Sequence, residues 1–545
     1  MKLKKYFPLL LLIIIQLFTT ILLWRPGMYL AHDSTNQVAR IGAYYKTFSD
    51  FNLPPRWAGD LNYGYGSPVF DFFYPLPGYL GSLFHALGMS LENSFKLIAG
   101  LGFIFAPLTF YFWFCNKFNK YVSFIAALFY GLAPYHFLDL YVRGDLGEIL
   151  GFVFIPLVFL FIDQIIEHPA ADKIVFGGIS FALLILAHNG LALIFTPVIL
   201  LYALLFSKNN DEFINLVRLF ILGFGISAFF WLPALYDARF TNFYFFNNGL
   251  FKLHFPSLRQ LLYSPWGFGP DVNMPGGLSP QIGPLHIFFV MLAMMFTLLG
   301  KRRERQLIFW LIIFAGAFFL STNYSLAVWE TVKPLRQLEF PWRFTALSGF
   351  TASVLAGLVI ARLNNKLVNA ATIILLMLLT SPLMKTGQLV YLNDKYYLSF
   401  PGTTTYHSET STVWAGSDAS TYPGKPVEVI GGKAIVTGDT KSNDSHSFII
   451  HSQSTSKILD NTLYFPGWRV KMDGQNVPVE FQDPNHKGLI TFSVPAGFHK
   501  VEVSFHETPL RLIADLISLI TVFLALLELF RANHITKLWT KKLSP

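Results

Sequence analysis

Apolar runs long enough to cross a membrane recur along this chain and restrict its fold more than any other feature. The first run covers residues 7–24 and follows the basic segment 2–5, which contains three lysines. A helix of this length can cross a hydrocarbon core of about 30 Å, and lysines before a first span favour a cytoplasmic N-terminus. The run is longer than the apolar core of a signal peptide, and Trp24-Arg25-Pro26-Gly27 lacks a small-residue cleavage site. We therefore expect a retained anchor.

Further apolar runs predict a polytopic α-helical membrane protein with about twelve spans. They lie at about 92–115, 121–139, 147–166, 174–187, 191–206, 214–236, 284–299, 306–321, 341–361, 367–384 and 509–531. Alternating sides then place the basic loop 301–305 and the lysine-containing tail in the cytoplasm, as the excess of basic residues in cytoplasmic loops requires. The sequence thus predicts an integral protein of the plasma (inner) membrane with both termini in the cytoplasm.

The composition excludes several other classes of protein. Of the 545 residues, 53% are hydrophobic and 13% are charged, and the charged share is about half that of a soluble domain. The net charge of +9 does not indicate nucleic-acid binding, because the basic residues cluster in short loops, where membrane orientation explains them. The single cysteine, Cys115, excludes a disulfide framework and a thiolate metal site.

Two segments do not fit a simple series of spans. Residues 69–88 are apolar, but counting them as a span would invert the basic loop 301–305. We expect a helix lying at or dipping into the outer interface, where aromatic residues and prolines are common. The runs on either side of His188-Asn189-Gly190 are short for two spans and too long for one, so we expect a tilted pair of helices joined by a tight outer turn.

Residues 385–508 lack apolar runs and have the pattern of a β domain. Val427-Glu428-Val429-Ile430 and residues 500–505 alternate apolar and polar side chains, which is the period of half-buried strands. Asp473-Gly474 between such runs is a hairpin-turn signal. We expect three parts: a membrane domain at 1–384 with an outer loop at 25–91, an extracytoplasmic β-sandwich or jelly-roll domain at 385–508, and a final span with a cytoplasmic tail at 509–545.

Two acidic clusters are expected on the same outer side of the membrane. His32-Asp33 follows the first span, and the segment 143–148, Arg-Gly-Asp-Leu-Gly-Glu, precedes a later one. The charged segment 333–343 also lies outside in this arrangement. Charges gathered on one face of a protein with many spans suggest chemistry rather than anchorage.

Several short motifs carry a resemblance to known families. The first span, the outer loop that opens with His32-Asp33, and residues 74–80, Tyr-Pro-Leu-Pro-Gly-Tyr-Leu, resemble the GT-C superfamily of glycosyltransferases that use polyprenyl-phosphate sugars. More narrowly, the segment 143–148, Phe340-Pro-Trp-Arg343 and Tyr464-Phe-Pro-Gly-Trp468 resemble bacterial 6-pyruvoyl-tetrahydropterin-synthase-related integral membrane proteins, whose relatives are implicated in glycosylating cell-envelope polymers. The similarity covers nearly the whole chain. It implies no pterin chemistry, because the sequence has no cluster of three histidines at metal-ligand spacing.

The resemblance implies a reaction and roles for the charged residues. Transfer of a sugar from a lipid phosphate to a hydroxyl needs a carboxylate that takes the hydroxyl proton, and Asp33 is the candidate. The leaving phosphate needs charge neutralisation, which a fork-shaped arginine supplies with two parallel hydrogen bonds; Arg343, with Arg336 nearby, is the candidate. The full set comprises Asp33, Asp145 and Glu148 as catalytic residues and His32, Arg143, His188, Arg336, Glu339 and Arg343 as substrate-binding residues.

Each candidate also has a purely structural interpretation. Asp33 is a favoured N-cap type and precedes a helical segment at 38–45. The charges of 143–148 suit a self-compensated helix start, with the acids favoured by the helix dipole. The charges of 336–343 suit an interfacial ion pair, and His188 suits a polar turn. The sequence leaves both interpretations open.

The candidate residues also offer ligands for a divalent metal ion, Mg or Mn. Asp33, Asp145, Glu148 and His188 offer the oxygen and nitrogen ligands that such an ion takes. Some GT-C enzymes use a metal and others do not, and this chain lacks a clean Asp-x-Asp motif. The sequence therefore leaves metal dependence undecided.

Three functions stay open. The first is transfer of a sugar from a polyprenyl-phosphate donor to an envelope polymer or glycoprotein, with membrane lipid as the surroundings and no nucleic acid. The second is a transporter or flippase of lipid-linked envelope precursors, which would more often carry charges near the middle of its spans and paired broken helices. The third is a non-catalytic envelope assembly factor. The position of the charges at the outer ends of spans favours the enzyme.

Overall fold

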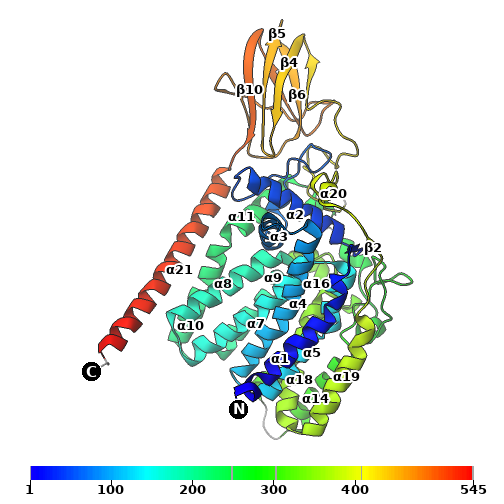
Figure 1. Cartoon of the computed structure of the whole chain (residues 1–545), viewed down its shortest axis with the longest axis vertical. Helices are drawn as coiled ribbons and strands as arrows, with labels where there is room; N and C mark the ends of the chain where they lie inside the picture. Colours follow the sequence, from blue (N-terminus) through cyan, green and yellow to red (C-terminus); the bar gives the residue numbers. More distant parts are fainter. Residues whose placement is uncertain (1, 247–248, 301–303, 407, 543–545) are drawn as a thin grey trace.

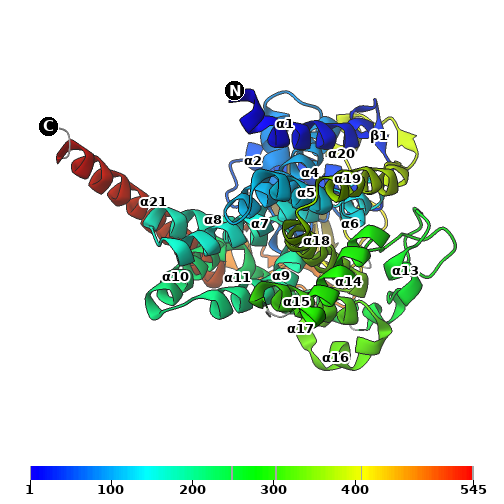
Figure 2. The ribbon, with the colours of Figure 1, turned by 90° about the horizontal axis from the view of Figure 1, so that it is seen from below.

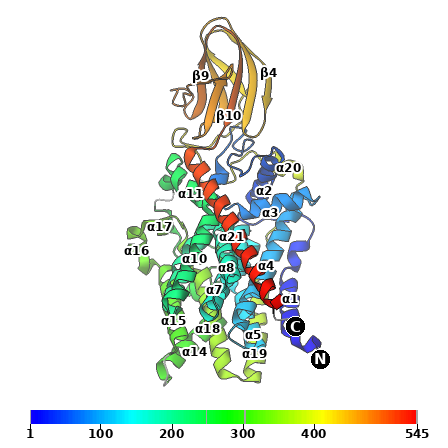
Figure 3. The same ribbon diagram turned by 90° about the vertical axis from the view of Figure 1, so that its left-hand side faces the viewer.

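The computed structural model describes residues 2–246, 249–300, 304–406 and 408–542. A bundle of helices forms the larger part of the molecule, and two β-sheets stand on one end of it (Figure 1, Figure 3). The chain is thus a helical membrane protein with a β-sheet domain near its C-terminus, as the apolar runs and the alternating segments predicted.

Each apolar run that was expected as a span is helical. The helices are α1 (Lys2–Thr19), α2 (Ser34–Ser49), α3 (Leu76–Ala86), α4 (Leu91–Cys115), α5 (Lys120–Gly131), α6 (Pro134–Phe137), α7 (Leu146–Glu167), α8 (Ala171–Ala187), α9 (Asn189–Phe206), α10 (Asn210–Ile226), α11 (Ala228–Asp237), α12 (Phe243–Phe246), α13 (Leu258–Leu262), α14 (Pro284–Leu299), α15 (Arg305–Leu320), α16 (Leu326–Thr331), α17 (Lys333–Arg336), α18 (Phe344–Leu363), α19 (Lys366–Thr380), α20 (Asp394–Leu398) and α21 (Pro509–Lys542). Within the described residues, six helices are long and apolar enough to cross a membrane, or nine if each of three bent pairs counts as one span. The count of about twelve stays a prediction.

Local sequence signals determine where several of these helices begin and break. The side chain of Ser90 accepts the backbone N–H of Asn93 and so caps α4, and Asn119 caps α5 in the same way. Pro134 occupies the first turn of α6, where a proline disturbs no helical hydrogen bond. Helix α5 and the helical segment that begins with α6 form one of the bent pairs, and the chain bends by 46° between them. The second member of this pair leads directly into the acidic segment 143–148.

The outer loop forms a layer between the bundle and the sheets. Helices α2 and α3 lie across the end of the bundle, beneath the sheets (Figure 1). Helix α3 has 11 residues, which is short for a span, and packs against α2 and α4. A two-stranded ladder, β1 (Met28–Tyr29) with β2 (Leu389–Val390), joins the start of this loop to the segment after α19. Helices α8 and α9 meet at His188, in agreement with the tight turn that was expected there.

Two antiparallel sheets share one apolar core above the bundle. The larger sheet has the order β4-β5-β10-β7-β8, and the smaller has the order β3-β6-β9. The strands are β3 (Val427–Gly431), β4 (Ala434–Lys441), β5 (Ser445–Ser452), β6 (Ser456–Leu463), β7 (Trp468–Met472), β8 (Gln475–Val477), β9 (Leu489–Val494) and β10 (Gly497–Phe505). Buried side chains from both sheets, among them Phe448, Ile490 and Val503, form the shared core. Asp473 and Gly474 both have positive φ in the β7–β8 turn, as the hairpin signal predicted.

Buried ion pairs join the last helix to the outer loop. Arg511 in α21 pairs with Asp237 of α11 (Nε–Oδ2 2.9 Å) and with Asp71 of the outer loop (Nη2–Oδ2 3.1 Å). Arg56 also contacts Asp71 (Nη1–Oδ1 3.3 Å) and pairs with Asp515 of α21 (Nη2–Oδ1 2.7 Å). Figure 2 shows α21 leaving the bundle beside α8, α10 and α11. The ion pairs therefore hold the upper end of α21 against α11 and the outer loop.

Candidate active site

The two acidic segments of the sequence meet at the end of the bundle beneath the sheets. The backbone N–H groups of His32 and Asp33 donate hydrogen bonds to the carbonyls of Val142 (2.9 Å) and Arg143 (2.8 Å). Backbone hydrogen bonds of this length are well formed and independent of side-chain rotamer. They fix the His-Asp segment beside residues 143–148.

Gly144 makes this close approach feasible. The residue follows a π-helical turn, η3 (Leu138–Arg143), and has a φ of +67°, in the left-handed region that favours glycine. A Cβ at this position would lie 3.0 Å from the Cβ of Ala31 and 3.2 Å from the backbone nitrogen of Ser34. Any side chain here would push the outer loop away from the acidic segment.

Arg143 lies at the centre of a buried ion-pair network. Its guanidinium contacts the carboxylates of Asp139, Asp145 (Nη2–Oδ2 3.0 Å) and Glu148 (Nη1–Oε1 2.8 Å). The ring of Trp342 lies 5.0 Å from the guanidinium carbon. All four charged side chains are buried, and charges in such surroundings persist only when they are paired. The charges of 143–148 thus compensate one another.

Arg343, which precedes α18, and His188, which lies between α8 and α9, extend the network. Arg343 Nε lies 3.2 Å from Glu148 Oε1, so one carboxylate is shared by two arginines. His188 Nε2 lies 3.6 Å from Asp145 Oδ2 and 3.9 Å from Glu148 Oε1. Five of the residues expected from the sequence therefore come together in one buried cluster. They are Arg143, Asp145, Glu148, His188 and Arg343.

Three members of this cluster meet the distance condition for a shared metal ion. The ligand atoms of Asp145, Glu148 and His188 lie within 4.8 Å of one another. Within the part of the chain that the structure describes, Asp33 is not a member of this group. The hydrogen bonding of His188 does not suit a ligand, however. Its Nδ1 accepts the backbone N–H of Leu191 at 2.9 Å, so the proton of the neutral ring is on Nε2, the atom that faces the carboxylates.

A metal-bound histidine has the opposite arrangement, because it donates its second N–H to an acceptor and coordinates with the unprotonated nitrogen. Arginine groups also already neutralise the carboxylates of Asp145 and Glu148. The donor set therefore fits an ion-pair network with a neutral histidine better than a divalent metal centre.

Asp33 stands at the N-cap of α2, yet among the described residues its side chain makes no capping hydrogen bond. Burial raises the pKa of the Asp33 carboxyl above its usual value, and the Asp145 carboxylate raises it further, whereas Arg143 lowers it. The hydroxyl of Tyr406 donates to the carbonyl of His32 (2.9 Å) and so brings the segment after α20 to this position. The capping interpretation lacks its hydrogen bond, and a raised pKa suits a proton acceptor.

Two other expected residues point to the surrounding loops. His32 Nε2 lies 2.9 Å from the carbonyl oxygen of Phe268, in the loop between α13 and α14. Burial lowers the pKa of the His32 imidazole. Arg336 donates hydrogen bonds to the backbone carbonyls of residues 329 and 330, which direct it toward α16. Among the described residues, Arg343 is the one of these two arginines with an ion pair to the network.

A second acidic pair, Glu339 and Glu409, lies close to the network. Glu339 has a φ of +60°, which is rare for a residue other than glycine and is found mostly where the surrounding structure enforces it. Burial, together with the Glu339 carboxylate, raises the pKa of Glu409 to about 8, while Arg40 and Arg343 act in the opposite direction. No sequence motif indicated that the segment around Glu409 would reach this place.

Sequence reasoning also missed residues that hold the cluster in place. Tyr74 donates a hydrogen bond to Asp145 Oδ1 (2.9 Å), and Tyr135 donates one to Glu148 Oε2 (2.8 Å). The tyrosines come from the outer loop and from α6. Asp139 could have been found, because it is an acid inside an apolar run, and ionisable residues in spans are usually functional.

Arg40 was not among the site residues expected from the sequence, and one nitrogen of its guanidinium has no hydrogen-bond partner among the described residues. It follows Asp33 by seven residues, which is about two helical turns, so both lie on one face of α2. Its guanidinium is buried, donates to the carbonyl of Thr404 (2.7 Å) and stacks on Phe73 at 4.0 Å. In the part of the chain that the structure describes, its Nη1 has no hydrogen-bond partner. The seven-residue spacing was the signal that could have identified it.

Comparison with known families gives one match over more than half of the chain. The family described as a 6-pyruvoyl-tetrahydropterin synthase related domain, membrane protein, matches residues 70–388, a range that includes the buried cluster but not Asp33. An uncharacterised protein of Lactococcus lactis subsp. cremoris is 22% identical over 350 residues, which cover 61% of this chain and 54% of that protein. The chain thus spans about half the length of this curated relative.

Solved structures that are similar to this chain come from GT-C glycosyltransferases. The oligosaccharyltransferase of Archaeoglobus fulgidus, tethered with an acceptor peptide, has a TM-score of 0.49 and 17% identity and covers 77% of this chain and 61% of its own. The mycobacterial arabinofuranosyltransferase AftD has a TM-score of 0.44 and 15% identity, over 69% of this chain and 26% of its own. ArnT from Cupriavidus metallidurans, bound to undecaprenyl phosphate, has a TM-score of 0.43 and 13% identity, over 71% and 67%.

Proposed function

This chain belongs to the family of 6-pyruvoyl-tetrahydropterin-synthase-related membrane proteins, and we propose that it is a GT-C glycosyltransferase that moves a sugar from a polyprenyl phosphate to a cell-envelope acceptor. The acceptor is an envelope polymer or a glycoprotein, and the reaction takes place at the outer face of the plasma membrane. The resemblance of the motifs at 32–33, 74–80 and 143–148 to this superfamily supports the proposal.

The observation that carries the proposal is the position of Asp33. Backbone hydrogen bonds hold it beside an arginine network, its carboxylate caps no helix within the described part of the chain, and burial raises its pKa. A carboxylate in this setting can take the proton of an acceptor hydroxyl while the hydroxyl oxygen attacks the anomeric carbon. As the new bond forms, the bond between the anomeric carbon and the phosphate oxygen breaks, and the polyprenyl phosphate leaves.

Arg343 is the proposed ligand of the donor phosphate. Its Nε pairs with Glu148, and its Nη1 donates to the carbonyl of Leu338 at 2.7 Å, so the plane of the guanidinium is held in one orientation. The side chain is 14% exposed and is the most accessible of the cluster. A planar guanidinium matches two phosphate oxygens, and the open Nη1 of Arg40 offers another donor on the Asp33 side.

Asp145 and Glu148, expected as catalytic residues, receive a supporting role in this proposal. Arginines form ion pairs with both carboxylates, and tyrosine hydroxyls and the N-cap hydrogen bonds of α7 engage Asp145 Oδ1 and Glu148 Oε2. We assign them the positioning of Arg343 and Arg143. No step of the proposed reaction passes through a metal ion, because the tautomer of His188 does not suit a ligand.

The arrangement in the membrane is also part of the proposal. Twelve spans, with both termini in the cytoplasm, would put the basic loop 301–305 inside and the cluster around Arg143 at the outer end of the bundle. The extracytoplasmic unit at 385–508 would then stand over the active site and hold a polymeric acceptor.

A transfer assay with the purified full-length protein tests the function. Radiolabelled sugars are supplied on undecaprenyl phosphate and on dolichol phosphate, the lipids present in structures of ArnT and of the archaeal oligosaccharyltransferase, together with crude envelope polymer. Label is expected to move to the polymer, with and without EDTA, and to be lost in Asp33→Asn. Failure of every donor with a folded protein would overturn the proposal. Movement of the lipid-linked sugar across liposomes without transfer would instead indicate a flippase.

A further inference from the structure

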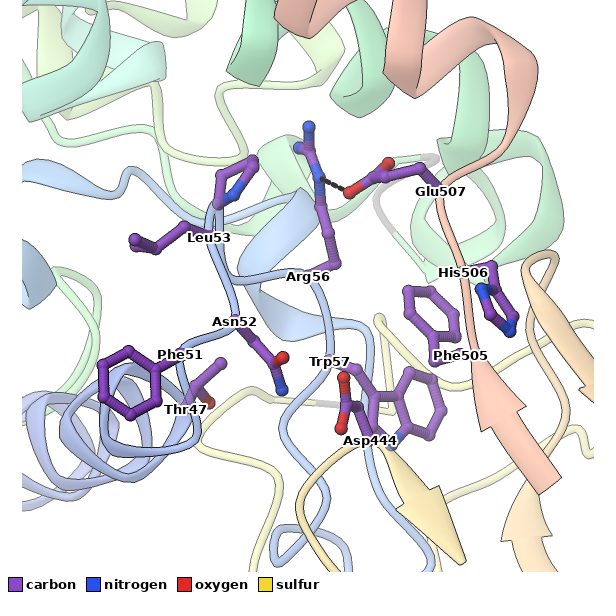
Figure 4. Close-up of a pocket in the computed structure, with 11 residues that line it drawn as sticks. Thr47, Phe51, Asn52, Leu53, Arg56, Trp57, Asp444, Phe505, His506 and Glu507 are labelled. Carbon is purple, nitrogen blue, oxygen red and sulfur yellow. Dashed lines mark hydrogen bonds and ion pairs between the residues drawn. The ribbon is translucent and has the colours of Figure 1, made fainter. Parts of the chain in front are cut away.

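A pocket of about 220 Å³ lies where the outer loop meets the β domain (Figure 4). Thr47 of α2, residues 51–54, Arg56 and Trp57 line it from the loop side, and Asp444 with residues 505–507 line it from the β domain. Asp33 stands at the other end of α2, and the intervening helix places it about 20 Å from Thr47. The pocket is therefore separate from the candidate active site but joined to it by one rigid element.

Two buried polar atoms in this pocket lack a hydrogen-bond partner among residues 2–246, 249–300, 304–406 and 408–542. Asn52 Nδ2 is a donor, and Glu507 Oε2 is an acceptor. The other oxygen of Glu507 contacts Arg56 Nε at 3.1 Å, which holds the carboxylate in place (Figure 4). Buried donors and acceptors are rarely left unpaired, so this pair suits a molecule that both accepts and donates hydrogen bonds.

An aromatic ring is held at the rim of the pocket. Phe51 is 89% exposed and has a φ of +61°. A bulky residue in the left-handed region is an outlier, and such strain gathers at sites that bind ligands. The rings of Trp57 and Phe505, whose centroids lie 5.5 Å apart, also line the pocket. Polar groups beside flat apolar rings match the two chemical faces of a sugar, its hydroxyls and its C–H groups.

The charge of the lining selects against anions. Asp444 and Glu507 supply two carboxylates and Arg56 one cation, which also pairs with Asp515 of α21. Burial lowers the pKa of the His506 imidazole, so this ring adds no positive charge at neutral pH. A ligand that carries phosphate or carboxylate would be repelled.

We propose that this pocket binds one neutral sugar residue of the acceptor polymer. Its volume equals that of about seven water molecules and is below the range of about 300–1,000 Å³ for pockets that hold drug-sized ligands, so it suits a single sugar ring rather than a chain. The assignment of that sugar to the acceptor rests on the proposed glycosyl transfer, whereas sugar binding by the pocket does not.

Binding of small sugars to the full-length protein in detergent tests the proposal. Saturation-transfer NMR is measured with methyl glucoside, methyl galactoside and N-acetylglucosamine, and with glucuronate as the anionic counterpart. Phe51→Gly removes the ring and suits the local φ, and Asn52→Leu removes the donor at similar size. Phe498→Ala is the matched control, because Phe498 is an exposed aromatic of the β domain outside the pocket.

Wild type and Phe498→Ala are expected to bind at least one neutral sugar and to reject glucuronate. Asn52→Leu should weaken that binding about tenfold, the factor that one hydrogen bond typically contributes. Phe51→Gly should weaken it by a factor of similar size, about tenfold, because the sugar loses its contact with the aromatic ring. Unchanged thermal midpoints separate lost binding from lost folding. Absence of binding in wild type, or equal binding in the pocket variants, would mean that the pocket holds water only and would overturn the proposal.

The transfer assay separates this inference from the proposed function. Sugar binding that depends on Phe51 and Asn52, without transfer from any donor, would support the sugar-binding pocket and contradict the proposed glycosyltransferase activity. Transfer by Phe51→Gly with an unchanged KM for the polymer would support the proposed enzyme activity and contradict the proposed role of the pocket in acceptor binding. An increased acceptor KM with an unchanged kcat is the expected result.

Discussion

The backbone N–H of Asp33 donates a 2.8 Å hydrogen bond to the carbonyl of Arg143. This bond places the carboxylate of the outer loop next to the guanidinium network of the bundle without using either side chain. Substitution of the Asp33 side chain therefore leaves the bond in place, so Asp33 variants report on the carboxylate rather than on the loop.

Asp33→Asn should lower the rate of sugar transfer by about 10² or more and leave donor binding nearly unchanged, because a proton acceptor acts mainly in the transition state. The thermal midpoint should stay the same, since the side chain caps nothing in the described structure. Asp60→Asn, an exposed acid of the same loop, is the control. Transfer by Asp33→Asn at the wild-type rate would move the chemistry to another carboxylate.

Arg343→Lys should weaken donor binding by roughly tenfold or more, because an ammonium does not reproduce the planar fork that pairs with Glu148 and with two phosphate oxygens. Binding of undecaprenyl phosphate to the purified variant measures the effect. Arg336→Lys serves as the control, since the hydrogen bonds of Arg336 to the carbonyls of residues 329 and 330 direct it toward α16. Equal affinities of wild type and Arg343→Lys would reassign Arg343 to an interfacial ion pair.

The membrane orientation predicts which engineered cysteines react from outside intact cells. In a Cys115→Ala background, cysteines at Asp60 and Ser442 should react with a membrane-impermeant thiol reagent, and one at Asn365 should not. All three positions are exposed, whereas Ser34 is buried and would not report on sidedness. Labelling at Asn365 without labelling at Ser442 would reverse the arrangement.

Glu409 should make stability fall as pH rises. Its pKa lies at about 8 in the folded protein against an ordinary value of 4.5, so the native state binds its proton more tightly than the unfolded state does. The contribution is fully present below pH 4.5 and is lost as pH rises toward about 8. Thermal midpoints of wild type relative to Glu409→Gln should decline across this window. A constant difference between the two proteins would show that Glu409 titrates normally.

Arg511→Met should destabilise the protein by about 3–5 kcal/mol, because it leaves Asp71 and Asp237 buried without this partner. Denaturant unfolding in detergent measures the loss. Arg469→Met, at an exposed position of β7, should change stability by no more than about 0.5 kcal/mol. A wild-type midpoint for Arg511→Met would mean that the α21 junction does not depend on these ion pairs.

Much of the architecture was predictable because it depends on local properties of the chain. The length of each apolar run predicts a helix, and alternation with period two predicts a strand, so both the bundle and the sheets followed from short windows of sequence. The turn at Asp473–Gly474 and the helix junction at His188 were predictable for the same reason. The short motifs also identified five members of the buried cluster, since charged residues are rare in such a chain.

By itself, the sequence determined a helical membrane protein with a β domain and named most of the charged residues at its candidate site. Only the tertiary structure decided that Tyr74, Tyr135 and Asp139 would satisfy those charges and that Glu409 would lie near Glu339. It also decided that the Asp33 carboxylate would make no capping hydrogen bond to α2 among the described residues. The proton position on His188, which argues against a metal, also depends on a fold-dependent hydrogen bond to Leu191. Pairing of buried charges is a property of three-dimensional neighbours, and segments far apart in the chain become neighbours only when the helices pack.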